Sequence, residues 1–149
     1  ALSLKARALR LLAQREHSRS ELVAKLGRHV QEGDDLGALL DALQAKGFID
    51  EARVAESVLH RRAPLLGTQR VLQELRRKGL GDDLVQRAAA QLTGSELERA
   101  RAVWTRRFGS APAADTPQER ARQMRFLASR GFAADVVRRV VRGGRSDEL

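Results

Sequence analysis

Apolar residues recur along this chain at the spacing of an amphipathic helix. Between residues 36 and 43, leucines stand at i, i+3, i+4 and i+7, and similar stripes run through 84–92 and 136–141. Valine and isoleucine are few and dispersed, and no run alternates apolar and polar positions with a period of two. The pattern therefore predicts an all-α protein without strands.

The stripes and the breaks between them predict nine helices in three groups of three. The first group covers residues 4–15, 19–29 and 35–46, and the second covers 51–63, 68–78 and 82–92. The third group covers 96–108, 117–130 and 134–142, and each limit holds to about 2–4 residues.

Residues with helix-capping chemistry stand at several predicted ends. Asp50 can accept one of the free backbone N–H groups at the start of the helix 51–63, and Pro64 prevents that helix from continuing. Capping boxes are predicted at Ser18-x-x-Glu21, Ser95-x-x-Glu98 and Thr116-Pro117-x-Glu119. Left-handed C-terminal caps are predicted at Gly47, Gly79 and Gly131.

An internal repeat supports the grouping. Residues 72–88 align with residues 124–140, with identical residues in pairs such as Gly79/Gly131 and Asp83/Asp135. The first group follows the pattern less closely, because residues 31–34 lengthen it. We expect three three-helix repeats, at 1–50, 51–94 and 95–149, which stack into an elongated, curved body because each is too small to stand alone.

Charge is distributed unevenly. The chain carries a net charge of +9, yet basic and acidic side chains balance over residues 1–52, whereas residues 99–149 hold twelve basic and five acidic side chains. Such asymmetry favours an acidic partner, either nucleic acid or an acidic protein surface. Because arginine predominates and binds phosphate and carboxylate in bidentate fashion, a membrane surface is disfavoured.

Several classes of chemistry are absent from the pattern. The chain has no cysteine, no phosphate-binding glycine loop and no nucleophile–base arrangement. His17, His29 and His60 are isolated, so they are expected to be incidental rather than metal ligands. We therefore expect no enzyme activity, no catalytic residues, no metal, no cofactor and no small-molecule substrate. No apolar run is long enough for a membrane span, and the composition fits the cytoplasm.

The few aromatic residues are expected to be structural. Trp104 and Phe108 stand at i and i+4, where they could stack on bases or anchor a partner, but the core of the third repeat is the favoured reading. Phe48 and Phe132 each follow a glycine and are expected to be buried at turns.

The candidate binding surface consists of cationic residues on the helices of the second and third repeats. A charge run is often only a solvated face, but a one-sided excess across two repeats favours binding. The surface comprises Arg61, Arg62, Arg70, Arg76, Arg77, Lys78, Arg106, Arg107, Arg122, Arg125, Arg138, Arg139 and Arg142.

Sequence-specific reading of DNA is disfavoured. Helices 68–78 and 82–92 are joined by a tight glycine-containing turn, as in a helix-turn-helix. However, the candidate recognition helix begins with Asp82 and Asp83, which would repel phosphate.

One stretch also resembles a known family. Residues 47–56, GFIDEARVAE, and 67–79, GTQRVLQELRRKG, are similar to the RecX family of bacterial regulators of the RecA recombinase, and residues 8–26 resemble that family's opening. The resemblance is clearest over residues 6–92. Val54 stands where the family pattern has Phe, and residues 31–34 are extra, which are changes of packing and loop.

The resemblance implies a regulator that binds RecA nucleoprotein filaments and restrains their recombinase and ATPase activities, tempering DNA repair and the SOS response. The basic surface also predicts contact with single- and double-stranded DNA without sequence preference. The residues alone leave two alternatives, a stand-alone basic nucleic-acid-binding protein and an adaptor for another acidic protein.

Overall fold

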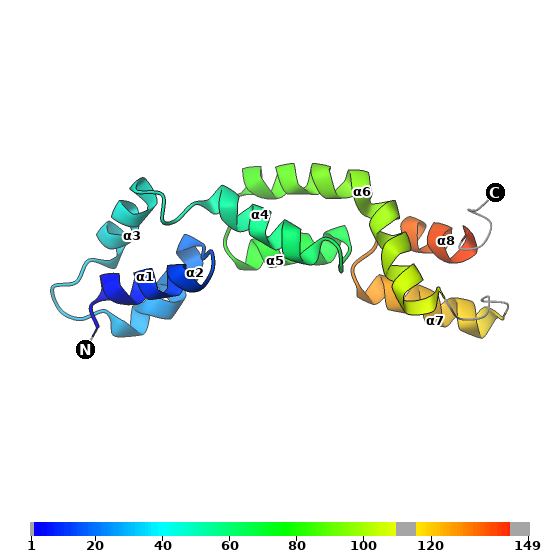
Figure 1. The fold of residues 1–149 in the computed structure, drawn as a ribbon, viewed down its shortest axis with the longest axis horizontal. Coiled ribbons are helices and arrows are strands. Elements are labelled where there is room, and N and C mark those ends of the chain that lie inside the picture. Colours follow the sequence, from blue (N-terminus) through cyan, green and yellow to red (C-terminus); the bar gives the residue numbers. More distant parts are fainter. Residues whose placement is uncertain (1, 110–115, 144–149) are drawn as a thin grey trace.

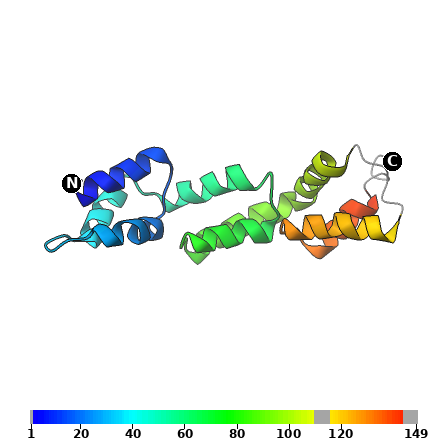
Figure 2. The ribbon, with the colours of Figure 1, turned by 90° about the horizontal axis from the view of Figure 1, so that it is seen from below.

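The computed structural model describes residues 2–109 and 116–143. Over these residues the chain forms eight α-helices, one short 3-10 turn and no strand, which confirms the all-α prediction. The elements are α1 (Leu4–Gln14), α2 (Arg19–Leu26), the turn η1 (Gly27–His29), α3 (Leu36–Ala45), α4 (Glu51–Arg62), α5 (Thr68–Arg77), α6 (Asp82–Phe108), α7 (Pro117–Ser129) and α8 (Ala134–Gly143). They lie in a row along one axis, as Figures 1 and 2 show from two sides.

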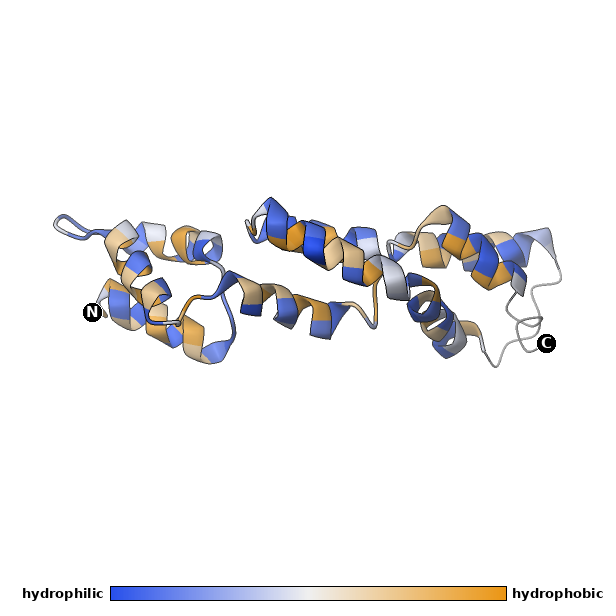
Figure 3. Ribbon diagram, turned by 90° about the horizontal axis from the view of Figure 1, so that it is seen from above, coloured by the Kyte–Doolittle hydropathy of each residue, from blue (hydrophilic) through white to orange (hydrophobic). Residues whose placement is uncertain are grey.

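Three separate apolar clusters hold this row together. The first lies among α1, α2 and α3 and includes Leu22 and Leu40. The second lies among α4, α5 and the first half of α6, around Leu75. The third joins the second half of α6 to α7 and α8, around Leu127. In Figure 3, polar and apolar bands alternate along the helices, as expected of amphipathic helices.

Most of the predicted caps are present. The Ser18 hydroxyl accepts the Glu21 N–H and the Glu21 carboxylate accepts the Ser18 N–H, which completes the predicted capping box. Asp50 accepts the Arg53 N–H at 3.2 Å. The three predicted C-terminal glycines have positive φ, at 84° for Gly47, 77° for Gly79 and 94° for Gly131.

The predicted break between residues 92 and 96 is wrong, because α6 runs unbroken for 27 residues. Ser95 caps nothing; its hydroxyl donates to the Leu92 carbonyl at 3.3 Å within the helix. The reason is a buried row at a spacing of four, Ala88, Leu92, Glu96 and Ala100, which continues across the polar residues that suggested a break. One helix thus serves the second and third clusters, and the proposed repeat limit at 94 and 95 stays a prediction.

Two further predictions concern single side chains. Phe132 is buried, as expected, but Phe48 is 47% exposed, and the neighbouring Ile49 enters the core in its place. His17 is not incidental, since it is only 1% exposed. Its Nδ1–H donates to the Arg15 carbonyl at 3.0 Å, and its Nε2 accepts from the Lys25 ammonium at 3.2 Å.

Consecutive units meet through a repeated junction. At the first junction, the hydroxyl of Ser18, which caps α2, donates to the carbonyl of Lys78 at the end of α5 at 2.6 Å. At the second, the N–H of Gly67, which precedes α5, donates to the carbonyl of Arg130 at the end of α7 at 2.7 Å. In both, the end of one unit's middle helix docks on the start of the preceding unit's middle helix. Repetition of this contact produces the linear body.

Candidate basic binding surface

The cationic side chains of α8 form the clearest part of the surface. Val137, Val140 and Val141 are buried against the third cluster, and the solvent side of the same helix presents Arg138, Arg139 and Arg142. At the positions equivalent to Arg138 and Arg142, α6 has Gln86 and Ala90. The third unit therefore carries a cationic helix face that the second unit lacks.

Other predicted arginines are similarly exposed on neighbouring helices. None of their side chains forms a hydrogen bond, ion pair or ring contact with another residue in 2–109 or 116–143. They are Arg61 at the end of α4, Arg76 and Arg77 at the end of α5, and Arg125 on α7. Because their charges are not neutralised within that part of the chain, they are available to phosphate or carboxylate groups.

Arg106 and Arg107 line a notch of about 300 Å³ with Arg130, Leu65 and Phe126. The Arg107 and Arg130 guanidinium carbons lie 5.1 and 4.8 Å from the centre of the Phe126 ring, so the ring holds both cations in place. Leu65 is 49% exposed at the same place. The notch therefore combines fixed positive charge with an apolar contact, which suits an acidic segment that also carries an apolar side chain.

The structure engages the remaining predicted cations in internal contacts. Arg62 pairs with Glu74 at 3.0 Å, and Arg122 pairs with Glu119 at 2.8 Å. Arg70 donates to the Ser129 carbonyl at 2.7 Å, across the second junction. These three side chains therefore stabilise the packing of helices and a junction, and they are less available to an external partner because each already has an internal one.

Lys78 lies at the first junction and is only 15% exposed, 3.2 Å from Glu21. Burial alone would raise the pKa of Glu21, but hydrogen bonds from Arg15 and Ser18 and the charge of Lys78 lower it to about 2. Arg15 lies 2.8 Å from the same carboxylate. Glu21 thus stays ionised between two cations, and Lys78 acts between units rather than on the surface.

Sequence reasoning missed a buried ion pair on α6. The Glu96 carboxylate is 6% exposed and accepts the N–H groups of Thr68 at 2.9 Å and Ala133 at 2.8 Å. It therefore satisfies the starts of α5 and α8 at once. Arg99, one turn on, donates to the carbonyls of Ala63, Leu66 and Leu92. A Glu and an Arg three apart on a helix are typical of a solvated face, so the sequence held no signal for this role.

The aromatic residues of the third unit are structural, as expected. Phe108 is buried, and its ring meets Phe126 edge to face at 5.4 Å between centroids. Trp104 donates its indole N–H to the Gln123 side chain at 2.9 Å. Among the residues that the structure describes, no group of His, Asp or Glu could hold a metal ion, and no helix is long and apolar enough to cross a membrane.

Comparison with known proteins identifies the family. The family model for the second three-helix domain of RecX matches residues 50–88, and that for the third three-helix domain matches residues 95–141. The chain is 54% identical over 141 residues to the regulatory protein RecX of Leptothrix cholodnii, covering 95% of this chain and 88% of the relative. It is 51% identical over 142 residues to the regulatory protein RecX of Ralstonia nicotianae, with the same coverage.

Solved structures share the fold. The crystal structure of RecX from Lactobacillus salivarius superposes with a TM-score of 0.76 at 18% identity, covering 98% of this chain and 96% of that one. A second crystal structure, of a regulatory protein RecX, gives a TM-score of 0.74 at 23% identity, covering 93% and 71%. With two family models matched and relatives half identical along nearly its full length, this chain belongs to the RecX family of regulatory proteins.

Proposed function

We propose that this protein binds the RecA nucleoprotein filament in the cytoplasm and inhibits its ATPase and recombinase activities, thereby tempering DNA repair and the SOS response. Membership of a family of regulatory proteins supports a regulatory rather than an enzymatic role. The observation that carries the proposal is the set of exposed arginines on α8, at Arg125 of α7 and at the end of α5, whose side chains have no partner within residues 2–109 and 116–143. A filament groove offers these cations both acidic side chains and DNA phosphate.

The shape of the molecule supports a filament as the partner. The described helices lie in a line (Figure 1), and the exposed arginines of the proposed surface are distributed over α4, α5, α6, α7 and α8. An extended partner with repeated subunits can contact several units at once, and such linked contacts strengthen one another.

Contact with single- and double-stranded DNA is proposed to be independent of sequence. The exposed cations are arginines at helix ends and on solvent faces, where they suit phosphate rather than base edges. The start of α6, which a helix-turn-helix would place in the major groove, carries the exposed Asp82 and Asp83. This placement disfavours base reading by that helix.

The test is ATP hydrolysis by RecA on single-stranded DNA, with increasing amounts of this protein at two salt concentrations. The triple variant R138A/R139A/R142A should need at least about tenfold more protein for half inhibition, since three exposed charge contacts are lost. A matched control, K5A/K46A/R87A, removes the same charge from exposed positions outside the proposed surface. Equal inhibition by both triple variants would show that α8 is not the contact.

The alternative is a stand-alone nucleic-acid-binding protein, which the net charge of +9 favours. The two functions differ in their response to excess DNA. A filament inhibitor should act well below one copy per RecA monomer and persist when DNA is in excess. Inhibition that extra DNA abolishes would mean competition for DNA alone.

A further inference from the structure

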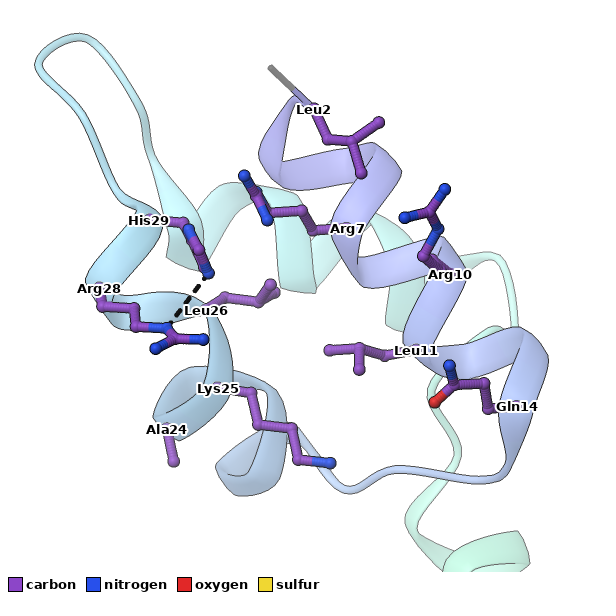
Figure 4. Close-up of a pocket in the computed structure, with 10 residues that line it drawn as sticks. All are labelled: Leu2, Arg7, Arg10, Leu11, Gln14, Ala24, Lys25, Leu26, Arg28 and His29. Atoms are coloured by element: carbon purple, nitrogen blue, oxygen red, sulfur yellow. Dashed lines mark hydrogen bonds between the residues drawn. The ribbon is translucent and has the colours of Figure 1, made fainter.

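The first unit contains a pocket lined by cations, although basic and acidic side chains balance over residues 1–52. A cavity of about 630 Å³ lies between α1, α2 and η1. Its lining includes Arg7 and Arg10 from α1, Lys25 from α2, and Arg28 and His29 from η1, together with the apolar side chains of Leu11 and Leu26. In Figure 4, Leu11 and Leu26 point toward each other from facing helices, and Arg7 extends toward His29.

Cations line this pocket and carboxylates do not, because the acidic residues of the unit serve elsewhere. Glu21 is held at the first junction, and Glu16 pairs with Arg53 at 2.8 Å. Asp41 pairs with Arg19 at 2.7 Å, and Asp35 caps α3. The charges of residues 1–52 balance in number, but four of the eight cations line this one cavity and none of the eight acidic side chains does.

The arginines of the pocket are not neutralised by other side chains. Arg7 and Arg10 have no ion pair or hydrogen-bonded side-chain partner within residues 2–109 and 116–143. Arg28 donates from Nε to His29 Nε2 at 3.3 Å, a contact that requires the neutral imidazole. Burial lowers the pKa of His29, and the charges of Arg7 and Arg28 lower it further. His29 is therefore neutral and leaves the guanidinium charges uncompensated.

We propose that this pocket binds the phosphate of a nucleotide unit, with the base or sugar against Leu11. Its volume lies in the range of small-molecule sites, which combine an apolar lining with a few convergent polar groups. Arginine is suited to bidentate contact with phosphate oxygens. The proposal is independent of the RecA surface on α5, α7 and α8.

The arrangement favours a compact anion over an extended acidic peptide. The arginines come from two segments and surround one cavity beside an apolar floor, instead of following a groove. The nucleotide unit has two sources, a free nucleotide or the phosphorylated end of a nucleic-acid strand.

Calorimetry on the full chain at low salt distinguishes these sources. The probes are ATP, a short thymidine oligonucleotide with a 5′-phosphate, and the same oligonucleotide without it. We expect binding of at least one phosphate-bearing probe, and binding at least about tenfold weaker in R10Q/R28Q, whose two side chains are exposed and so do not endanger folding. The control K5Q/K46Q removes the same charge from exposed positions outside both the pocket and the α8 surface, and it should bind that probe as the unaltered protein does.

A preference for ATP would identify a free nucleotide, and a preference for the phosphorylated oligonucleotide would identify a strand end. Three results would overturn the proposal. The first is that neither ATP nor the phosphorylated oligonucleotide binds at millimolar concentration. The second is that the two oligonucleotides bind equally and ATP does not bind. The third is that R10Q/R28Q leaves binding unaffected. Loss of RecA inhibition in the α8 variant with the pocket's affinity retained would separate this site from the proposed surface.

Discussion

The Glu96 carboxylate accepts the backbone N–H of Thr68 at 2.9 Å and thereby fixes the start of α5 to the middle of α6. Because the same carboxylate also accepts from Ala133, a single side chain satisfies two helix starts in different units. Glu96 is therefore a buried polar contact between the second and third clusters.

Replacement of Glu96 by alanine should destabilise the protein by about 3 kcal/mol. The change leaves two backbone N–H groups without their acceptor and Arg99 without its carboxylate. Urea denaturation followed by circular dichroism measures the free energy of unfolding. The control is Glu98→Ala, an exposed position on the same helix, which should change stability by less than about 0.5 kcal/mol. Similar values for the two variants would refute the bridging role.

Gly67→Ala should disturb the second junction. A Cβ at Gly67 would collide with the backbone of Gly131 and Phe132, which cannot move without separating α5 from α7. We expect a loss of stability above the roughly 1 kcal/mol typical of point variants, together with a changed small-angle scattering profile. Gly81→Ala is a matched control, since Gly81 also precedes a helix with extended backbone and has open space around its Cβ. If both variants scatter like the unaltered protein, the close contact is not structurally required.

Glu21 should make stability depend on pH in the acid range. Its pKa in the folded protein is about 2, below the ordinary value of 4.5, so its stabilisation is complete above about pH 5 and is lost as the pH falls toward 2. The contribution is at most about 3 kcal/mol. Between pH 6 and pH 3, the midpoint temperature of thermal unfolding should fall less steeply in Glu21→Gln than in the unaltered protein. Asp41→Asn, at an exposed ion pair, should keep the original slope.

Leu65→Asp should reduce RecA inhibition by several-fold without unfolding the protein. The side chain is 49% exposed in the notch, so its burial stabilises the fold little, whereas a carboxylate there would pair with Arg106 or Arg107 and repel an acidic partner. The readout is RecA ATPase inhibition, with circular dichroism as the test of folding. Val23→Asp, at another exposed apolar residue, on α2 outside the proposed surface, is the control. Unchanged inhibition by Leu65→Asp would remove the notch from the interface.

Local signals in the sequence predicted most of the fold. Helix stripes, the Ser18 box and the glycines with positive φ depend on near neighbours, so they are legible without a structure. The continuity of α6 could not be predicted in this way, because residues 93–95 resemble a helix boundary. The helix continues through them because Glu96 has tertiary partners, which the sequence does not show. The cations were predicted as a group, but Arg70 and Lys78 proved to be junction residues. That distinction depends on contacts between units distant in sequence.

The continuity of α6 sets a fixed spacing in the molecule. The 27-residue α6 has a contour length of about 40 Å and bends between its two halves (Figure 1), so this one continuous helix sets the separation between the arginines near the end of α5 and those of α8. A partner must therefore present its acidic groups at a matching interval to engage both. A polymer of identical subunits has such an interval built in, whereas a single subunit does not.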